Sequence, residues 1–174
     1  MEGGTRPPRP AEGSGIRGGT QDARAGWPRI AVGVDLVEVA RVQSLLEDNP
    51  AAETELFTTR EIRYCAGKRN RYARLAARFA AKEAALKALG TGLGPGMRWT
   101  DVEVVNEPLG RPRLRLHGTA AQAAGAPGSW SAELSLTHTD DYAMAQAVLL
   151  LSRVADEPAM RRTATDEGSP CASI

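Results

Sequence analysis

Glu83 is the residue of this chain whose position most suggests chemistry. Residues 73–90, ARLAARFAAKEAALKALG, have the periodicity of one amphipathic helix, and Glu83 falls inside the apolar stripe. A buried carboxylate must be neutralised, paired or bound to a metal. Lys87 follows one turn later on the same side. Spacing alone does not separate a functional acid from an ordinary surface pair, which would contribute only about 0.3 to 0.5 kcal/mol.

A second carboxylate, Asp35, ends the apolar run IAVGVDL at residues 30–36. Its β-branched residues predict a buried strand. Strand ends often carry ligand-binding carboxylates, although an Asp there also caps a following helix. The spacing of apolar residues over 37–48 predicts a helix directly after this strand. Arg41 lies off its apolar face, so we expect Arg41 to point outward.

The elements that must position these residues predict an α+β fold. Thr58 and Glu61 form a capping-box pattern at the start of a short helix, and glycines fill the loop 90–96 after the long helix. The other predicted elements are helices at 59–66 and 117–124 and strands at 99–105, 113–116, 130–137 and 142–151. This order favours a mostly antiparallel sheet packed against the long central helix.

Length and composition divide the 174 residues into three parts. Residues 1–28 are rich in Gly, Arg and Pro, which predicts a disordered extension. Residues 29–151 form the expected folded domain, and residues 152–174 form a polar, flexible tail. Two cysteines without metal spacing indicate a reducing compartment, and we expect a cytoplasmic protein without a membrane segment.

The net charge of +1 conceals a local excess of basic residues. Between positions 60 and 78 the basic residues are Arg60, Arg63, Lys68, Arg69, Arg71, Arg74 and Arg78. The one acid among them is Glu61. The excess indicates an anionic partner, namely phosphates, an acidic protein or nucleic acid, unless it is simply a solvated basic face.

Several motifs, taken in order, resemble the holo-acyl carrier protein synthases, the short class of 4′-phosphopantetheinyl transferases. The motifs are GVDLVEV at 33–39, RFAAKEA at 78–84, GTG at 90–92, GRP at 110–112 and SLTH at 135–138. The resemblance covers residues 30–151, and the combination of GVD with RFAAKEA is specific. It implies the 4′-phosphopantetheinyl transferase fold.

The resemblance implies an enzyme that moves the phosphopantetheine arm of coenzyme A onto a serine of an apo acyl carrier protein and releases adenosine 3′,5′-bisphosphate. It also implies that Asp35 and Glu83 are metal ligands. A hard cation held by one or two carboxylates and by substrate phosphates is typical of Mg²⁺, with Mn²⁺ as a substitute. Such a cation suits attack on a highly charged pyrophosphate, where catalysis depends on positioning and cations.

The motif matches assign further residues to coenzyme A. These residues are Lys82, Lys87, Gly90, Arg111, Pro112 and His138. Lys87 and Glu83 are also candidates for catalysis, and the general base is Lys87, Glu83 or a metal-bound water. His138 also suits an ordinary turn histidine, Gly110-Arg111-Pro112 an ordinary hairpin turn, and Lys82 a surface lysine.

The resemblance also implies partners. Acyl carrier proteins are acidic, so Arg41, Arg63 and Arg69 are expected to bind the carrier, through an attraction that weakens as salt rises. Short members of the family are homotrimers with active sites between subunits. The same arrangement here would combine Asp35 and Glu83 of one subunit with His138 or Arg111 of another.

Three other functions compete with this interpretation. A nucleic-acid-binding module would use the basic stretch, but it offers only Tyr64 and Tyr72 for stacking and leaves the two acids unexplained. A metal-dependent phosphohydrolase would need more acidic or histidine ligands. A non-catalytic carrier-binding scaffold would not need the motif acids and lysines, which are all present. We therefore expect no nucleic-acid partner.

Overall fold

The computed structural model describes residues 28–152, and the fold is α+β as predicted. The elements begin with strand β1 (Arg29–Glu38), followed by helices α1 (Val39–Asp48), α2 (Ala51–Leu56), α3 (Thr59–Cys65) and α4 (Arg71–Leu89). The second part contains a 3₁₀ turn η1 (Trp99–Asp101), strands β2 (Val102–Asn106) and β3 (Pro112–Leu116), helix α5 (Gly118–Ala124), and strands β4 (Trp130–His138) and β5 (Tyr142–Leu151). The extension at 1–28 and the tail at 152–174 lie outside the described residues, apart from Pro28 and Ser152, and stay predictions.

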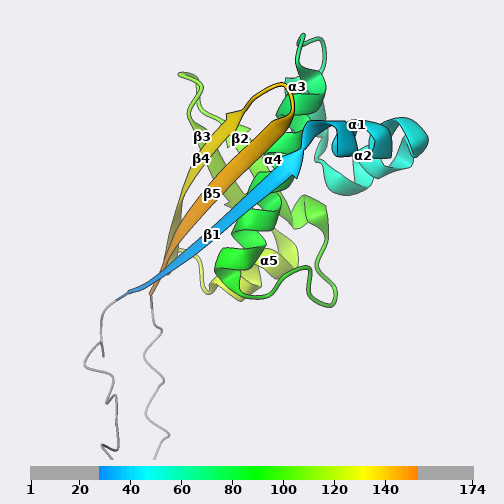
Figure 1. Cartoon of the computed structure of the whole chain (residues 1–174). Coiled ribbons are helices and arrows are strands. Elements are labelled where there is room, and N and C mark those ends of the chain that lie inside the picture. The colour runs from blue at the N-terminus through cyan, green and yellow to red at the C-terminus, as the bar shows by residue number, and fades with distance from the viewer. Residues whose placement is uncertain (1–27, 153–174) are drawn as a thin grey trace, which may run out of the picture.

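The strands form two antiparallel sheets within the described part of the chain. One has the order β1-β5-β4, and the other pairs β2 with β3. In the first sheet, Asp35 lies opposite Ala145, and His138 lies opposite Ala143. Helix α4 crosses one face of this sheet, and α1 and α2 lie beside the end of β1, as Figure 1 shows.

Alanines let α4 pack closely against the sheet. Ala80, Ala81, Ala84 and Ala85 are completely buried, and the larger Leu75 and Leu86 of the same helix are buried in the core with them. Gly90 ends the helix with a φ of 79°, a left-handed conformation that suits glycine. The long central helix predicted from the sequence is therefore confirmed, and its burial fixes which side chains face the sheet.

Two local predictions differ from the structure. No helix was predicted between residues 48 and 59, but α2 forms there, with Pro50 at its N-cap. The strand predicted at 99–105 begins later, at Val102, because residues 99–101 form the 3₁₀ turn η1, and its Glu103 is buried. Its carboxylate accepts a hydrogen bond from Thr58 at 2.9 Å and pairs with His117 at 3.2 Å, which explains how an acid is accommodated there.

Candidate active site

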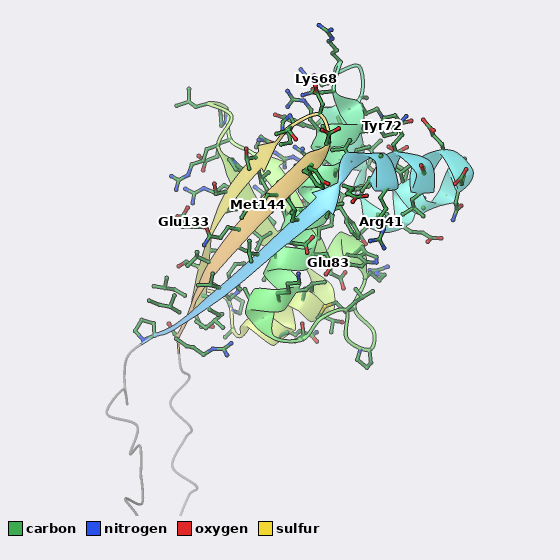
Figure 2. All side chains as sticks on the ribbon, in the orientation of Figure 1. Arg41, Lys68, Tyr72, Glu83, Glu133 and Met144 are labelled. Carbon is green, nitrogen blue, oxygen red and sulfur yellow. The ribbon has the colours of Figure 1, made fainter. Side chains whose placement is uncertain are left out.

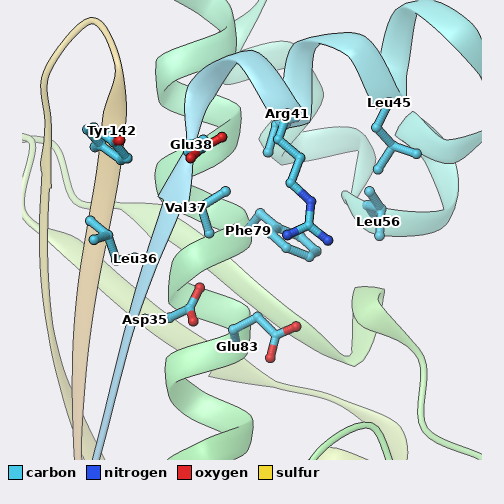
Figure 3. Close-up of a pocket in the computed structure, with 11 residues that line it drawn as sticks. Asp35, Leu36, Val37, Glu38, Arg41, Leu45, Leu56, Phe79, Glu83 and Tyr142 are labelled. Carbon is cyan, nitrogen blue, oxygen red and sulfur yellow. The ribbon is translucent and has the colours of Figure 1, made fainter.

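Gly33 allows β1 to reach the backbone of α4. A Cβ added at Gly33 would lie 1.9 Å from the Ala84 carbonyl oxygen and 2.8 Å from the Ala88 amide nitrogen. Asp35 comes two residues after Gly33 and therefore faces the same side of the strand. Glu83 precedes Ala84 on the helix, so the close contact brings the two predicted metal ligands to one place (Figure 3).

Lys87 joins this pair of carboxylates. Its Nζ donates hydrogen bonds to Asp35 Oδ1 at 2.7 Å and to the Val34 carbonyl at 3.2 Å. The bond to Asp35 raises the pKa of Lys87, so this amine is held in its charged form. The pKa of Glu83 is also raised, mainly because burial disfavours its charge and further because Asp35 is negative, while Lys87 opposes both effects.

The two carboxylates open into a pocket of about 530 Å³ between β1, α1 and α4. Phe79, Leu45 and Leu56 contribute apolar lining. Arg41 extends from α1 over this pocket, where Figure 3 shows its guanidinium near Phe79. Arg41 is exposed as expected, but it borders the same pocket as the acids, which spacing along the helix did not reveal.

Asp35 and Glu83 fit a divalent metal ion such as Mg²⁺. Their mutual repulsion is part of the reason that the pKa of Glu83 is raised, and a cation between them would relieve it. Among residues 28–152 no group of three or more His, Cys, Asp or Glu side chains could hold a metal. Two carboxylates are nevertheless enough for Mg²⁺ when substrate phosphates and water complete the shell.

Lys82 does not reach this site, so the prediction that it contacts coenzyme A is wrong. The side chain is completely buried, and Nζ donates to Glu61 Oε2 at 2.9 Å, to the Trp99 carbonyl at 3.1 Å and to the Val102 carbonyl. All three donors of the ammonium are therefore used inside the protein. Glu61 is equally buried and accepts from the backbone amides of Thr58 and Val104, so this pair is structural.

Apart from Lys87, the remaining residues predicted to contact coenzyme A lie away from the two carboxylates of the same chain. Gly90 ends α4, and Pro112 begins β3. Arg111 lies in the β2–β3 turn, where it is exposed and pairs with Glu133 at 2.6 Å. His138 ends β4 and lies 2.9 Å from Asn70 at the start of α4, which is about 20 Å along the helix axis from Glu83.

The predicted carrier-binding arginines come from three segments: Arg41 from α1, Arg63 from α3, and Arg69 from the loop before α4. Arg63 is exposed on α3, whereas Arg69 lines a second depression of about 620 Å³ together with Asn70 and Asp140. Glu38 lines the pocket of Asp35 and was missed at the sequence level. Its place inside the GVDLVEV motif, as the last residue of β1 before α1, was the signal that could have found it.

Comparison with known proteins gives one consistent family. The model of the 4′-phosphopantetheinyl transferase superfamily matches residues 31–147. The holo-[acyl-carrier-protein] synthase of Koribacter versatilis is 48% identical over 121 residues, which cover 69% of this chain and 97% of the relative. The synthase of Caldanaerobacter subterraneus is 39% identical over 119 residues, covering 68% and 93%.

Solved structures give the same result. The ACPS–CoA complex of Chronobacterium ammoniagenes has a TM-score of 0.63 and 32% identity, and covers 72% of this chain and 99% of that one. The Bacillus anthracis holo-(acyl-carrier-protein) synthase in complex with CoA (3′,5′-ADP) has a TM-score of 0.58 and 32% identity, with 70% and 96% covered. The chain belongs to the 4′-phosphopantetheinyl transferase superfamily and, within it, to the holo-[acyl-carrier-protein] synthases. The resemblance seen in the sequence motifs is thereby confirmed.

Proposed function

We propose that the protein transfers the 4′-phosphopantetheine group of coenzyme A to a serine of an apo acyl carrier protein, releasing adenosine 3′,5′-bisphosphate. The observation that carries this proposal is the convergence of Asp35, Glu83 and Lys87 beside one pocket within a family of synthases. The acids and the lysine provide both signs of charge needed around a pyrophosphate under attack.

In this proposal Asp35 and Glu83 hold Mg²⁺, for which Mn²⁺ substitutes. Bound there, the ion would offset the negative charge of the pyrophosphate and favour attack on phosphorus. Lys87 contacts a phosphate oxygen of coenzyme A. We assign Lys87 to charge and not to proton abstraction, because negative groups surround its ammonium and favour the protonated form: Asp35, which raises its pKa through a hydrogen bond, Glu83, and a phosphate once coenzyme A is bound. That leaves Glu83 or a metal-bound water as the base for the serine hydroxyl.

Arg41 is assigned to the carrier protein. It is exposed on α1 and borders the pocket that contains the carboxylates, so an acidic carrier docked on Arg41 would place its serine close to them. Arg63 and Arg69 are exposed and add to the positive field. Two other arginines of the basic stretch are engaged internally, since Arg71 pairs with Glu53 and Arg78 is buried against Tyr64, which removes them from any nucleic-acid surface.

We further propose a homotrimer with active sites between subunits. One face of the β1-β5-β4 sheet points away from α4 and carries exposed apolar side chains, on the side where Figure 2 shows Met144. They are Ile30, Val32, Val34, Leu36, Met144 and Leu150. An apolar patch of this kind indicates an interface. A partner across it would also explain why Arg111 and His138 lie apart from Asp35 within one chain.

A cytoplasmic location completes the proposal. Cys65 is a buried free thiol, as expected in a reducing compartment. No helix between residues 28 and 152 is long and apolar enough to cross a membrane.

The transfer proposal is tested by incubating the protein with coenzyme A, Mg²⁺ and apo carrier proteins, and by weighing each carrier as an intact protein. The expected result is a carrier heavier by one phosphopantetheine group, with no such product from Glu83→Gln. If several carriers at low and moderate salt all keep their mass, the proposed transfer is wrong. The trimer is tested separately by analytical ultracentrifugation of the wild type and of Val32→Glu.

A further inference from the structure

Lys87 binds the oxygen that a metal ion would also use. Its Nζ lies 2.7 Å from Asp35 Oδ1, a distance typical of a charge-assisted hydrogen bond. The Lys87 side chain is 51% exposed, whereas that of Asp35 is 16% exposed. The lysine thus covers a nearly buried carboxylate from the solvent side, and of the two partners only the lysine has room to move.

The charges make this arrangement a competition. Asp35 and Glu83 together carry two negative charges, and Lys87 cancels one of them. A divalent cation between the carboxylates would repel the ammonium at this short range and would take over its bond to Asp35. The Lys87 ammonium would then keep only its weaker bond, at 3.2 Å, to the neutral Val34 carbonyl.

A phosphate oxygen offers the displaced ammonium a replacement partner. Lys87 is anchored on the last turn of α4 and reaches Asp35 through a flexible four-carbon stem. Accepting from Lys87, a phosphate of coenzyme A would free Asp35 while keeping the lysine paired. The metal ion alone would leave the Lys87 ammonium without a charged partner, and coenzyme A alone would leave the two carboxylates without a cation. With both bound, the metal ion neutralises the carboxylates and the phosphate pairs with Lys87.

We propose that Lys87 is an internal competitor of the metal ion for Asp35, and that it is drawn away by the coenzyme A phosphate, so that metal and coenzyme A bind cooperatively. This inference rests on the proposed function, because it takes Asp35 and Glu83 as the metal ligands. The coupling is reciprocal: coenzyme A must tighten metal binding by the same factor as the metal tightens coenzyme A binding.

The experiment measures Mn²⁺ binding directly, from the electron paramagnetic resonance signal of free Mn²⁺, with the full-length protein in the absence of carrier. Breaking an exposed ion pair of this kind is worth up to about 1 kcal/mol, a factor of about five. Lys87→Met should therefore bind Mn²⁺ alone more tightly than the wild type, by a factor of up to about five. Lys68→Met, the same change at an exposed lysine in the α3–α4 loop, should bind like the wild type.

Adding coenzyme A gives the second measurement. Coenzyme A should lower the Kd of Mn²⁺ in the wild type by a larger factor than in Lys87→Met, because only the wild type has a lysine to draw away. Equal Mn²⁺ affinity in the wild type and Lys87→Met, with binding lost in Asp35→Asn, would overturn the competition and leave the proposed metal site intact. Unchanged Mn²⁺ binding in Asp35→Asn would overturn both the competition and the proposed site.

Discussion

Replacing Gly33 by alanine tests how the two carboxylates are brought together. The new Cβ would lie 1.9 Å from the Ala84 carbonyl oxygen, whereas real Cβ atoms essentially never come closer than 3.0 Å. Strand β1 and helix α4 must therefore separate by about 1.1 Å to restore 3.0 Å. The obstacle is backbone on both sides, so no side-chain rotation can relieve it.

The structure sets the size of two effects. Forced separation in a packed core costs about 1–3 kcal/mol, and the backbone clash places Gly33→Ala at or above the upper end. That corresponds to a fall in Tm of roughly 10 °C for a domain of this size. Displacement of Asp35 from Glu83 by about 1 Å should also reduce kcat/KM about 100-fold.

Differential scanning fluorimetry and the carrier mass assay measure the two effects on the same preparation. Gly94→Ala is the matched control, because Gly94 has no positive φ and its added Cβ would meet only the Thr91 carbonyl oxygen at 3.9 Å. This control should keep Tm and activity within error of the wild type. A Gly33→Ala protein with wild-type Tm and activity would refute the claim that close strand–helix contact builds the site.

Three further perturbations follow from the same geometry. Lys82→Met should lower the free energy of unfolding in urea by about 3–5 kcal/mol, because Glu61 stays buried and unpaired. The double variant Lys82→Met with Glu61→Gln should recover much of this loss, and no recovery would contradict a structural pair. The raised pKa of Glu83 means that its contribution to stability falls as pH rises above 4.5, so Glu83→Gln should gain Tm over the metal-free wild type at pH 7 but not at pH 4. Equal differences at both pH values would refute this. Arg41→Glu should raise the KM for carrier about tenfold with little change in kcat and flatten its salt dependence; a pure loss of kcat would exclude steering.

Much of the fold was predictable because local signals agreed with the tertiary structure. The Thr58–Glu61 capping box is present, with Glu61 accepting from the Thr58 amide at 2.8 Å, and Gly90 ends α4. The long-range role of Glu61 was not predictable, since its pairing with Lys82 depends on how α3 packs against α4. The burial of Glu103 in β2 was not predicted either, because it depends on the contacts of its carboxylate with Thr58 and His117.

The candidate site, like the fold, could be predicted from the sequence only in part. Motifs identified Asp35, Glu83 and Lys87, but no sequence pattern indicates that Lys87 bonds to Asp35 rather than to Glu83, four residues earlier on its own helix. Likewise, Lys82 and Lys87 stand on either side of Glu83 in the sequence, and only their burial in the structure separates their roles. Contacts between elements far apart in sequence decide these roles, and the close approach at Gly33 creates one of them.

The central claim is that Asp35 and Glu83 together hold the metal ion of the transferase. The most direct measurement is an anomalous difference map from a crystal grown with Mn²⁺ and coenzyme A. We predict one strong peak between the two carboxylates, within about 2.0–2.3 Å of an oxygen of each and bonded to a phosphate oxygen. A peak bound only to phosphates, with both carboxylates uncoordinated, would contradict the claim.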